Sequence, residues 1–143
     1  MKELSEGDKA PAFKELAENK GRIVVLYFYP KDNTPGCTTE ACELRDAHKQ
    51  IVAKHAVVLG VSPDSAKSHE RFATKFNLPF SLVPDEDRKL CEAYGVWKEK
   101  SMYGRKYLGV ERTTFVIGPD GIIKKIFRKV KAAGHAEEVL AAI

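Results

Sequence analysis

Residues 22–29 (RIVVLYFY) form a near-continuous run of apolar, β-branched and aromatic side chains. Such a run is typical of a central strand that is buried on both faces, as in a parallel sheet. Helical periodicity follows from Cys37 to about Ala53, and a second apolar strand is expected over residues 55–62. A further helix is expected to reach about Phe76. Strand and helix therefore alternate through the first half of the chain.

The second half is expected to add a short strand, a helix, a hairpin and a C-terminal helix. These elements are predicted at residues 79–84, 85–94, 113–129 and 134–143. Residues 97–109, which are rich in Lys, Tyr and Gly, are expected to be irregular. This order of elements predicts an α/β fold with a central mixed β-sheet flanked by helices, in the order of the thioredoxin fold. We expect residues 1–143 to form a single domain.

Composition narrows the class of protein. The chain of 143 residues is 43% hydrophobic and 31% charged, which is typical of a globular domain. Its net charge of +4 includes no long basic block, which argues against nucleic-acid binding. No apolar run approaches the ~20 residues of a membrane helix, and the polar, acidic N-terminus does not resemble a signal peptide. We therefore expect a cytoplasmic protein that binds neither nucleic acid nor membrane.

A cysteine follows the first apolar run at the start of the expected helix. Pro30 ends the run, residues 31–36 (KDNTPG) favour a turn, and Cys37 comes next. Backbone N–H groups and the helix dipole favour negative charge at this end of a helix, and so favour a thiolate there. Because the thiolate is the nucleophilic form of cysteine, the sequence predicts a reactive thiol at Cys37.

A second thiol, Cys42, lies five residues later. On one regular helix the two Cα atoms would be roughly 8.5 Å apart, whereas a disulfide needs less than about 7 Å. If the pair forms a disulfide, the first helical turn must therefore unwind. A reducing cytoplasm disfavours structural disulfides, so we expect any bridge among the three cysteines to be transient and catalytic.

The spacing predicts two states of this segment. In the reduced state the helix is formed and Cys37 is an activated thiolate. In the oxidised state residues 37–42 are locally unfolded and bridged. Attack of the thiolate on a peroxide O–O bond would link the states, because it gives a sulfenic acid that condenses with Cys42.

Several motifs resemble the peroxiredoxin family. The pattern Pro30-x-x-x-Thr34-x-x-Cys37 is similar to its active-site motif, and YFYPKDNTPGCTTEACELRD is similar to the bacterioferritin comigratory protein, or Q-type, branch. The resemblance covers nearly the whole chain and continues at residues 94–97 (YGVW), 102–107 (MYGRKY) and 111–115 (ERTTF). It implies a thioredoxin-like fold and a thiol peroxidase. Such an enzyme reduces hydrogen peroxide and organic hydroperoxides in antioxidant defence and cell redox homeostasis.

The resemblance also implies a role for each matched residue. Cys37 is similar to the peroxidatic cysteine, and the Thr34 hydroxyl would hold the thiolate and the attacked peroxide oxygen. Pro30 would shield the sulfenic acid from water, and Arg112 would bring its guanidinium to the thiolate and the peroxide. Cys42 matches the resolving cysteine, which would form a disulfide with Cys37. A thioredoxin-like dithiol would reduce that disulfide.

Elementary chemistry agrees with these roles. A thiolate that attacks a peroxide pushes negative charge onto the leaving oxygen, and a fixed cation with N–H and O–H donors stabilises that charge. Arginine suits this task because it stays charged and its fork can address two atoms. Glu40, three residues after Cys37, resembles a family position that hydrogen-bonds within the site and is a secondary candidate. We expect no metal, haem or flavin.

One departure from the family pattern concerns the N-terminal segment. Family members usually carry an additional short hairpin between an Ala-Pro-x-Phe segment and the first central strand. Here APAF at residues 10–13 is followed only by residues 14–20 before Gly21. We therefore expect a shortened N-terminal segment that adds no interface, and a monomer.

Other interpretations stay open at this point. Cys91 is either a partly buried helix cysteine or an alternative resolving thiol. A thioredoxin-like thiol–disulfide oxidoreductase is a second function, although the chain lacks the CxxC motif of that class. A third function is a redox sensor or holdase whose disulfide switches a binding surface.

Overall fold

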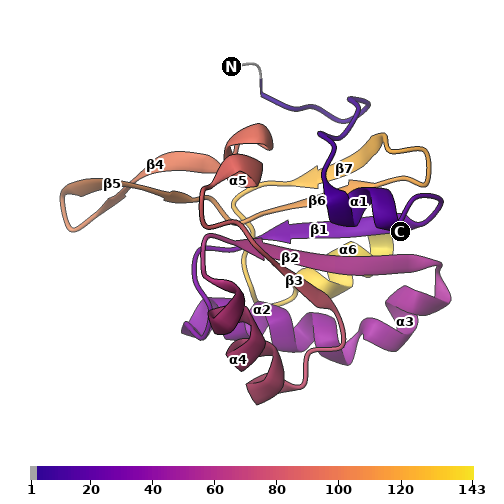
Figure 1. The fold of residues 1–143 in the computed structure, drawn as a ribbon, viewed down its shortest axis with the longest axis horizontal. Coiled ribbons are helices and arrows are strands. Elements are labelled where there is room, and N and C mark those ends of the chain that lie inside the picture. Colours follow the sequence, from indigo (N-terminus) through magenta and orange to yellow (C-terminus); the bar gives the residue numbers. More distant parts are fainter. Residues whose placement is uncertain (1–2) are drawn as a thin grey trace.

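The centre of the structure, a computed structural model that describes residues 3–143, is a five-stranded mixed sheet (Figure 1). Its strands are Ile23–Phe28 (β1), Ala56–Ser62 (β2), Ser81–Pro84 (β3), Thr113–Ile117 (β6) and Ile123–Phe127 (β7). Their order across the sheet is β3-β2-β1-β6-β7. Strands β1 to β3 are parallel, whereas β6 is antiparallel to both β1 and β7. The predicted α/β fold with a mixed sheet is confirmed.

Strand β1 lies at the centre because both of its faces are apolar. Val25 pairs with Val58 of β2 on one side and with Val116 of β6 on the other. Successive side chains point to opposite faces of a sheet, so Leu26 and Tyr27 enter two different cores. The buried apolar run of the sequence therefore supplies both cores at once.

Helices cover both faces of the sheet (Figure 1). One core lies under the helices Pro35–Asp46 (α2), His48–Ala53 (α3), Ala66–Phe76 (α4) and His135–Ala142 (α6). The short helices Lys14–Glu18 (α1) and Lys89–Ala93 (α5) lie on the other face. Within residues 3–143, no helix has the length and apolar character needed to cross a membrane.

The prediction that residues 97–109 are irregular is wrong. They form a two-stranded hairpin of Trp97–Met102 (β4) and Arg105–Val110 (β5), which projects from the body of the domain (Figure 1). The turn residues Tyr103 and Gly104 have φ of 52° and 77°, the positive values that a tight hairpin turn requires. Charged residues are mixed with aromatic and small residues in both strands, which therefore lack the apolar alternation by which a strand is recognised.

The predicted single helix from Cys37 to Ala53 is interrupted. Ala47, with φ −89° and ψ −2°, separates α2 from α3. The buried residues Leu44, Ala47 and Ile51 keep helical spacing across the break, so the apolar pattern does not reveal it.

The N-terminal segment precedes β1 and contains one short helix, α1. It runs beside the start of β7, where Gly7 N–H donates to the Ile123 carbonyl at 2.8 Å and Lys9 forms an isolated bridge with Ile122. Helix α1 then leads to β1, and Phe13 and Leu16 pack against the core on that face of the sheet.

A substitution at Gly60 of β2 would test how tightly side chains pack on the face of the sheet that α2 covers. A Cβ at this position would lie 2.8 Å from Leu82 Cδ2 and 2.9 Å from the Tyr27 ring. Because that ring is rigid, Gly60→Ala should lower the free energy of unfolding by about 1–3 kcal/mol, as over-packing usually does. Urea denaturation measures this change. The exposed hairpin variant Leu108→Ala is the control and should stay within about 0.5 kcal/mol of the wild type; equal unfolding midpoints for the two variants would contradict the packing.

Candidate active site

Cys37 lies in the first turn of α2, directly after the loop that leaves β1. Thr34 is the N-cap, and Pro35 occupies the first helical position, where its missing N–H costs no helical hydrogen bond. The first helical hydrogen bond runs from Thr38 N–H to the Thr34 carbonyl at 2.8 Å. The side chain of Cys37 packs among the residues of the α2 core, and only 2% of the residue is exposed.

Arg112 contacts the thiol of Cys37 although the two residues are far apart in the sequence. Strand β6 is antiparallel to β1, with Thr113 opposite Phe28, so the residue before β6 lies next to the loop that follows β1. The Nη2 atom of Arg112 donates to Cys37 Sγ at 3.3 Å. A guanidinium at this position favours the thiolate form of the cysteine.

Gly36 gives the guanidinium room. A Cβ on Gly36 would lie 3.1 Å from Nη2 of Arg112, closer than ordinary packing allows. The glycine that precedes the cysteine therefore has a steric function at the site in addition to its place in the turn.

Glu40 lies one helical turn after Cys37 and is also bound by Arg112. Its Oε1 accepts a hydrogen bond from Arg112 Nη1 at 2.7 Å, while Oε2 is buried with no partner among the described residues. Burial raises the pKa of Glu40 to about 7 despite the opposing effect of Arg112. Burial by itself would lower the pKa of Arg112, but the neighbouring Glu40 and Cys37 raise it, so the guanidinium stays charged.

The other two predicted residues lie in the loop before the helix. The Thr34 hydroxyl donates to the Lys31 carbonyl at 2.8 Å, and Pro30 is half-buried between Tyr29 and this turn. The structure thus brings Cys37 into contact with Arg112, and Arg112 into contact with Glu40. The roles of Thr34 and Pro30 toward a peroxide stay predictions.

Cys42 occupies the second half of the same intact helix. It is half-buried, and all three cysteines are free thiols. This arrangement corresponds to the reduced, helical state that the cysteine spacing predicts.

Comparison with known proteins identifies the family to which the chain belongs. Residues 4–126 match the model of the AhpC/TSA family. The chain belongs to the AhpC/TSA family. Peroxiredoxin Bcp of Bacillus subtilis is 51% identical over 134 residues, which cover 94% of this chain and 85% of the relative. The chain is therefore a peroxiredoxin of the Bcp, or Q-type, branch, and a thiol-dependent peroxidase.

Solved structures agree with this assignment. A cysteine-to-serine mutant of PrxQ from Xylella fastidiosa has a TM-score of 0.92 and 43% identity, and the match covers 99% of this chain and 96% of that one. Structures of the bacterioferritin comigratory protein from Xanthomonas campestris, which concern that protein's alkyl peroxide reduction activity, have a TM-score of 0.84 and 49% identity. That match covers 89% of this chain and 81% of that one. The predicted thioredoxin-like fold is confirmed, and the peroxidase assignment prevails over a thiol–disulfide oxidoreductase or a binding module.

Cys91 differs from the other two cysteines of this peroxiredoxin. It is fully buried in α5, and its backbone N–H donates to Asp85 Oδ2 at 2.8 Å. Burial, together with the Asp85 carboxylate, raises the pKa of the Cys91 thiol far above its ordinary value. A thiol that keeps its proton is a poor nucleophile, which favours the interpretation of Cys91 as a structural helix cysteine.

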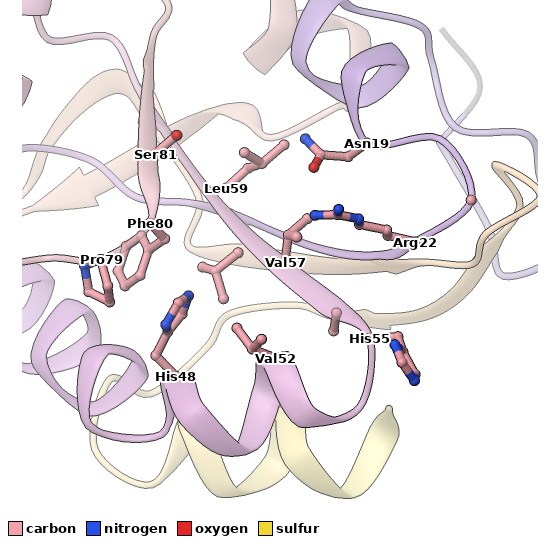
Figure 2. Close-up of a pocket in the computed structure, with 13 residues that line it drawn as sticks. Asn19, Arg22, His48, Val52, His55, Val57, Leu59, Pro79, Phe80 and Ser81 are labelled. Carbon is pink, nitrogen blue, oxygen red and sulfur yellow. The ribbon is translucent and has the colours of Figure 1, made fainter.

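A surface pocket of about 690 Å³ lies at the other end of the sheet (Figure 2). Its lining includes Arg22 just before β1, Ala56 at the start of β2 and Ser81 at the start of β3. Cys37, by contrast, follows the carboxyl end of β1. Because the three strands are parallel, the pocket and the thiol lie at opposite ends of the sheet.

Two features around the thiol were not predicted from the sequence. The steric function of Gly36 depends on Arg112, which is distant in sequence. Asp32 belongs to a run of turn residues that are usually exposed, yet it is buried. The sequence contains a partial signal for Asp32, because it follows a buried strand and lies close to Cys37.

Glu40 should make the stability of the protein depend on pH. Its pKa is about 7 in the folded chain and about 4.5 when unperturbed, so between these values the folded state holds a proton that the unfolded state has lost. The free energy of unfolding should therefore fall as pH rises from about 4.5 to 7, by on the order of 3 kcal/mol, and not fall further above 7. Urea denaturation across this range measures the slope.

Glu40→Gln should remove most of that slope, because glutamine has no proton to lose. Glu70→Gln on the exposed side of α4 is the control and should keep the wild-type slope. If Glu40→Gln and the wild type show the same pH dependence, Glu40 is not the group responsible.

Proposed function

We propose that Cys37 is the peroxidatic cysteine of this peroxiredoxin, with Arg112 as its activating cation. The observation that carries the proposal is the contact of 3.3 Å between Arg112 Nη2 and Cys37 Sγ in the first turn of α2. The helix N-terminus and the guanidinium both favour the thiolate, and both stay in place while it reacts.

The first step consumes the peroxide. The sulfur of the Cys37 thiolate attacks one peroxide oxygen with its electron pair, and the O–O bond breaks. The departing oxygen takes a proton and leaves as water or an alcohol, while Cys37 becomes a sulfenic acid. Negative charge moves from the sulfur to the departing oxygen, and the fork of Arg112 can contact both atoms.

Thr34 and Pro30 complete the proposed site. The Thr34 hydroxyl already donates to the Lys31 carbonyl, so its oxygen is oriented as an acceptor for the O–H of a bound hydroperoxide. Pro30 has no backbone N–H and presents an apolar ring, which would limit the access of water to the sulfenic acid. Glu40 holds the second arm of Arg112 through the contact of 2.7 Å.

We further propose that Cys42 resolves the sulfenic acid. Its sulfur attacks the sulfur of Cys37, the S–O bond breaks, and water leaves as the disulfide forms. The regular helix keeps the two Cα atoms too far apart, so the first turn of α2 must unwind for this step. Cys42 is more exposed than Cys91, and it lies on the same helix as Cys37.

The proposed substrates are hydrogen peroxide and organic hydroperoxides. The alkyl peroxide reduction of the Xanthomonas campestris relative supports the second class. A thioredoxin-like dithiol would reduce the Cys37–Cys42 disulfide and supply the two electrons of each turnover. We propose that the protein works in the cytoplasm as a monomeric single domain of residues 1–143, without a metal or cofactor.

Cys37→Ser should abolish peroxide consumption, because a serine hydroxyl stays protonated and cannot replace the thiolate. Loss of hydrogen peroxide and of cumene hydroperoxide, followed with dithiothreitol as reductant, measures the effect. Cys91→Ser is the matched control and should retain most of the activity. A fully active Cys37→Ser variant would refute the assignment.

Cys42→Ser should leave one turnover intact and slow recycling by thioredoxin. A dimedone-type reagent should trap the sulfenic acid of this variant, whereas peroxide-treated wild type should yield a peptide linked through Cys37 and Cys42. Mass spectrometry of the digested protein distinguishes the two products. A linked peptide that contains Cys91, or recycling at the wild-type rate, would assign resolution to another thiol.

A further inference from the structure

A buried polar cluster lies behind residues 30–34, the loop that leads to the reactive cysteine. Tyr29 follows β1, Asp32 lies in the loop, and Ser68 and His69 come from the first turn of α4. Asp32 is 7% exposed and His69 is 4% exposed. None of the steps proposed for the peroxidase uses this cluster.

Asp32 is held through both its side chain and its backbone. Its Oδ1 accepts from the Tyr29 hydroxyl at 2.5 Å, and its Oδ2 accepts from the Ser68 hydroxyl at 2.7 Å. The same Oδ2 lies 2.8 Å from Nδ1 of His69. The backbone N–H of Asp32 donates to Asp64 Oδ2 at 2.6 Å. The middle of the loop is therefore tied to the end of β1, to α4 and to the connection before α4.

Both ring nitrogens of His69 lie within hydrogen-bond distance of an oxygen atom. Nε2 lies 3.1 Å from the Val83 carbonyl. Burial by itself would raise the pKa of Asp32, but the bonds from His69, Tyr29 and Ser68 hold it below its ordinary value, so Asp32 is a carboxylate. A carboxylate can only accept, so Nδ1 faces Asp32 as a donor, and the buried pair ties α4 to the loop.

A buried pair of this kind is weak evidence of stabilisation, because apolar replacements of similar volume often cost nothing. The location of this pair suggests a different role. The Thr34 carbonyl, two residues after Asp32, accepts the first helical hydrogen bond from Thr38, in the turn that holds Cys37. The loop therefore sets the point from which α2 begins.

We propose that His69 and Asp32 are a positioning pair for peroxide reduction, because they fix the loop from which the first turn of α2 starts. The proposal rests on the proposed function, in which that turn unwinds and refolds in each cycle. With the loop fixed, refolding returns the Cys37 sulfur to Arg112. Neither His69 nor Asp32 contacts the thiol, so both act through the position of the loop.

Two amide substitutions separate the two hydrogen bonds of His69. The amide nitrogen of Asn occupies roughly the place of Nδ1, so His69→Asn keeps a donor toward Asp32. The amide nitrogen of Gln occupies roughly the place of Nε2, so His69→Gln keeps a donor toward Val83 and leaves Asp32 without this partner. The rate constant for oxidation of Cys37 by hydrogen peroxide, measured by competition with a haem peroxidase, is the readout.

His69→Gln should lower this rate constant by about 10- to 100-fold, since a misplacement of ~1 Å can cost that much. His69→Asn should stay within about fivefold of the wild type, because the bond to the loop is rescued. Urea denaturation accompanies each measurement and defines conditions under which every variant is folded. Equal losses in the two variants, or rates within twofold of the wild type in both, would overturn the proposal.

Two further variants serve as controls. Ser68→Ala removes one donor to Asp32 but keeps the contact between His69 and Asp32, and it should lower the oxidation rate several-fold; an unchanged rate would also overturn the proposal. Tyr94→Phe removes a buried hydrogen bond of 2.7 Å to the Pro11 carbonyl on the other face of the sheet. It should lower stability and leave the oxidation rate unchanged, and a rate that falls with stability in this variant counts against positioning by the loop. Failure of the peroxidase assignment itself is recognised separately, by an active Cys37→Ser variant.

Discussion

The antiparallel pairing of β6 with β1 is the contact on which the candidate active site depends. It places Thr113 opposite Phe28, and so brings Arg112 to a thiol that is 75 positions away in the sequence. Cys37 owes its place at a helix start to local sequence, but its cation arrives only through the sheet. The chemistry of the site therefore appears only when the central strands have paired, because the helix alone has the thiol without the guanidinium.

The guanidinium of Arg112, with its single positive charge, contacts two acidic groups. One arm contacts Cys37 and the other contacts Glu40, which is buried and has a pKa of about 7. The carboxyl group can thus be neutral or charged near neutral pH, whereas the guanidinium is always charged. Gly36 completes the arrangement by leaving the space that the fork occupies. The site combines a fixed cation with a neighbour of variable charge.

Sequence patterns predicted those parts of the molecule that depend on neighbouring residues. The apolar run identified β1, because a strand buried on both faces has no polar side to alternate, and the turn formers before Cys37 located the start of α2. The hairpin of β4 and β5 was not predicted, since its strands lack a regular alternation of apolar and polar side chains. The break between α2 and α3 at Ala47 was not predicted either, because the burial pattern continues across it.

Contacts between distant segments were beyond the reach of local patterns. The role of Arg112 came from family resemblance, and its geometry came from the sheet. The burial of Asp32 depends on partners in α4 and on the end of β1, whereas its immediate neighbours are turn residues. In the same way, the raised pKa of Glu40 follows from tertiary packing around α2 rather than from the helix sequence.

The burial of Cys37 also imposes an order on events. Only 2% of the residue is exposed, so the surface of a protein cannot reach the thiol while the helix is folded. In the proposed cycle a protein reductant would therefore meet the sulfur only after the first turn of α2 has unwound. Burial in the folded helix would thus exclude a large reductant until the peroxide has reacted.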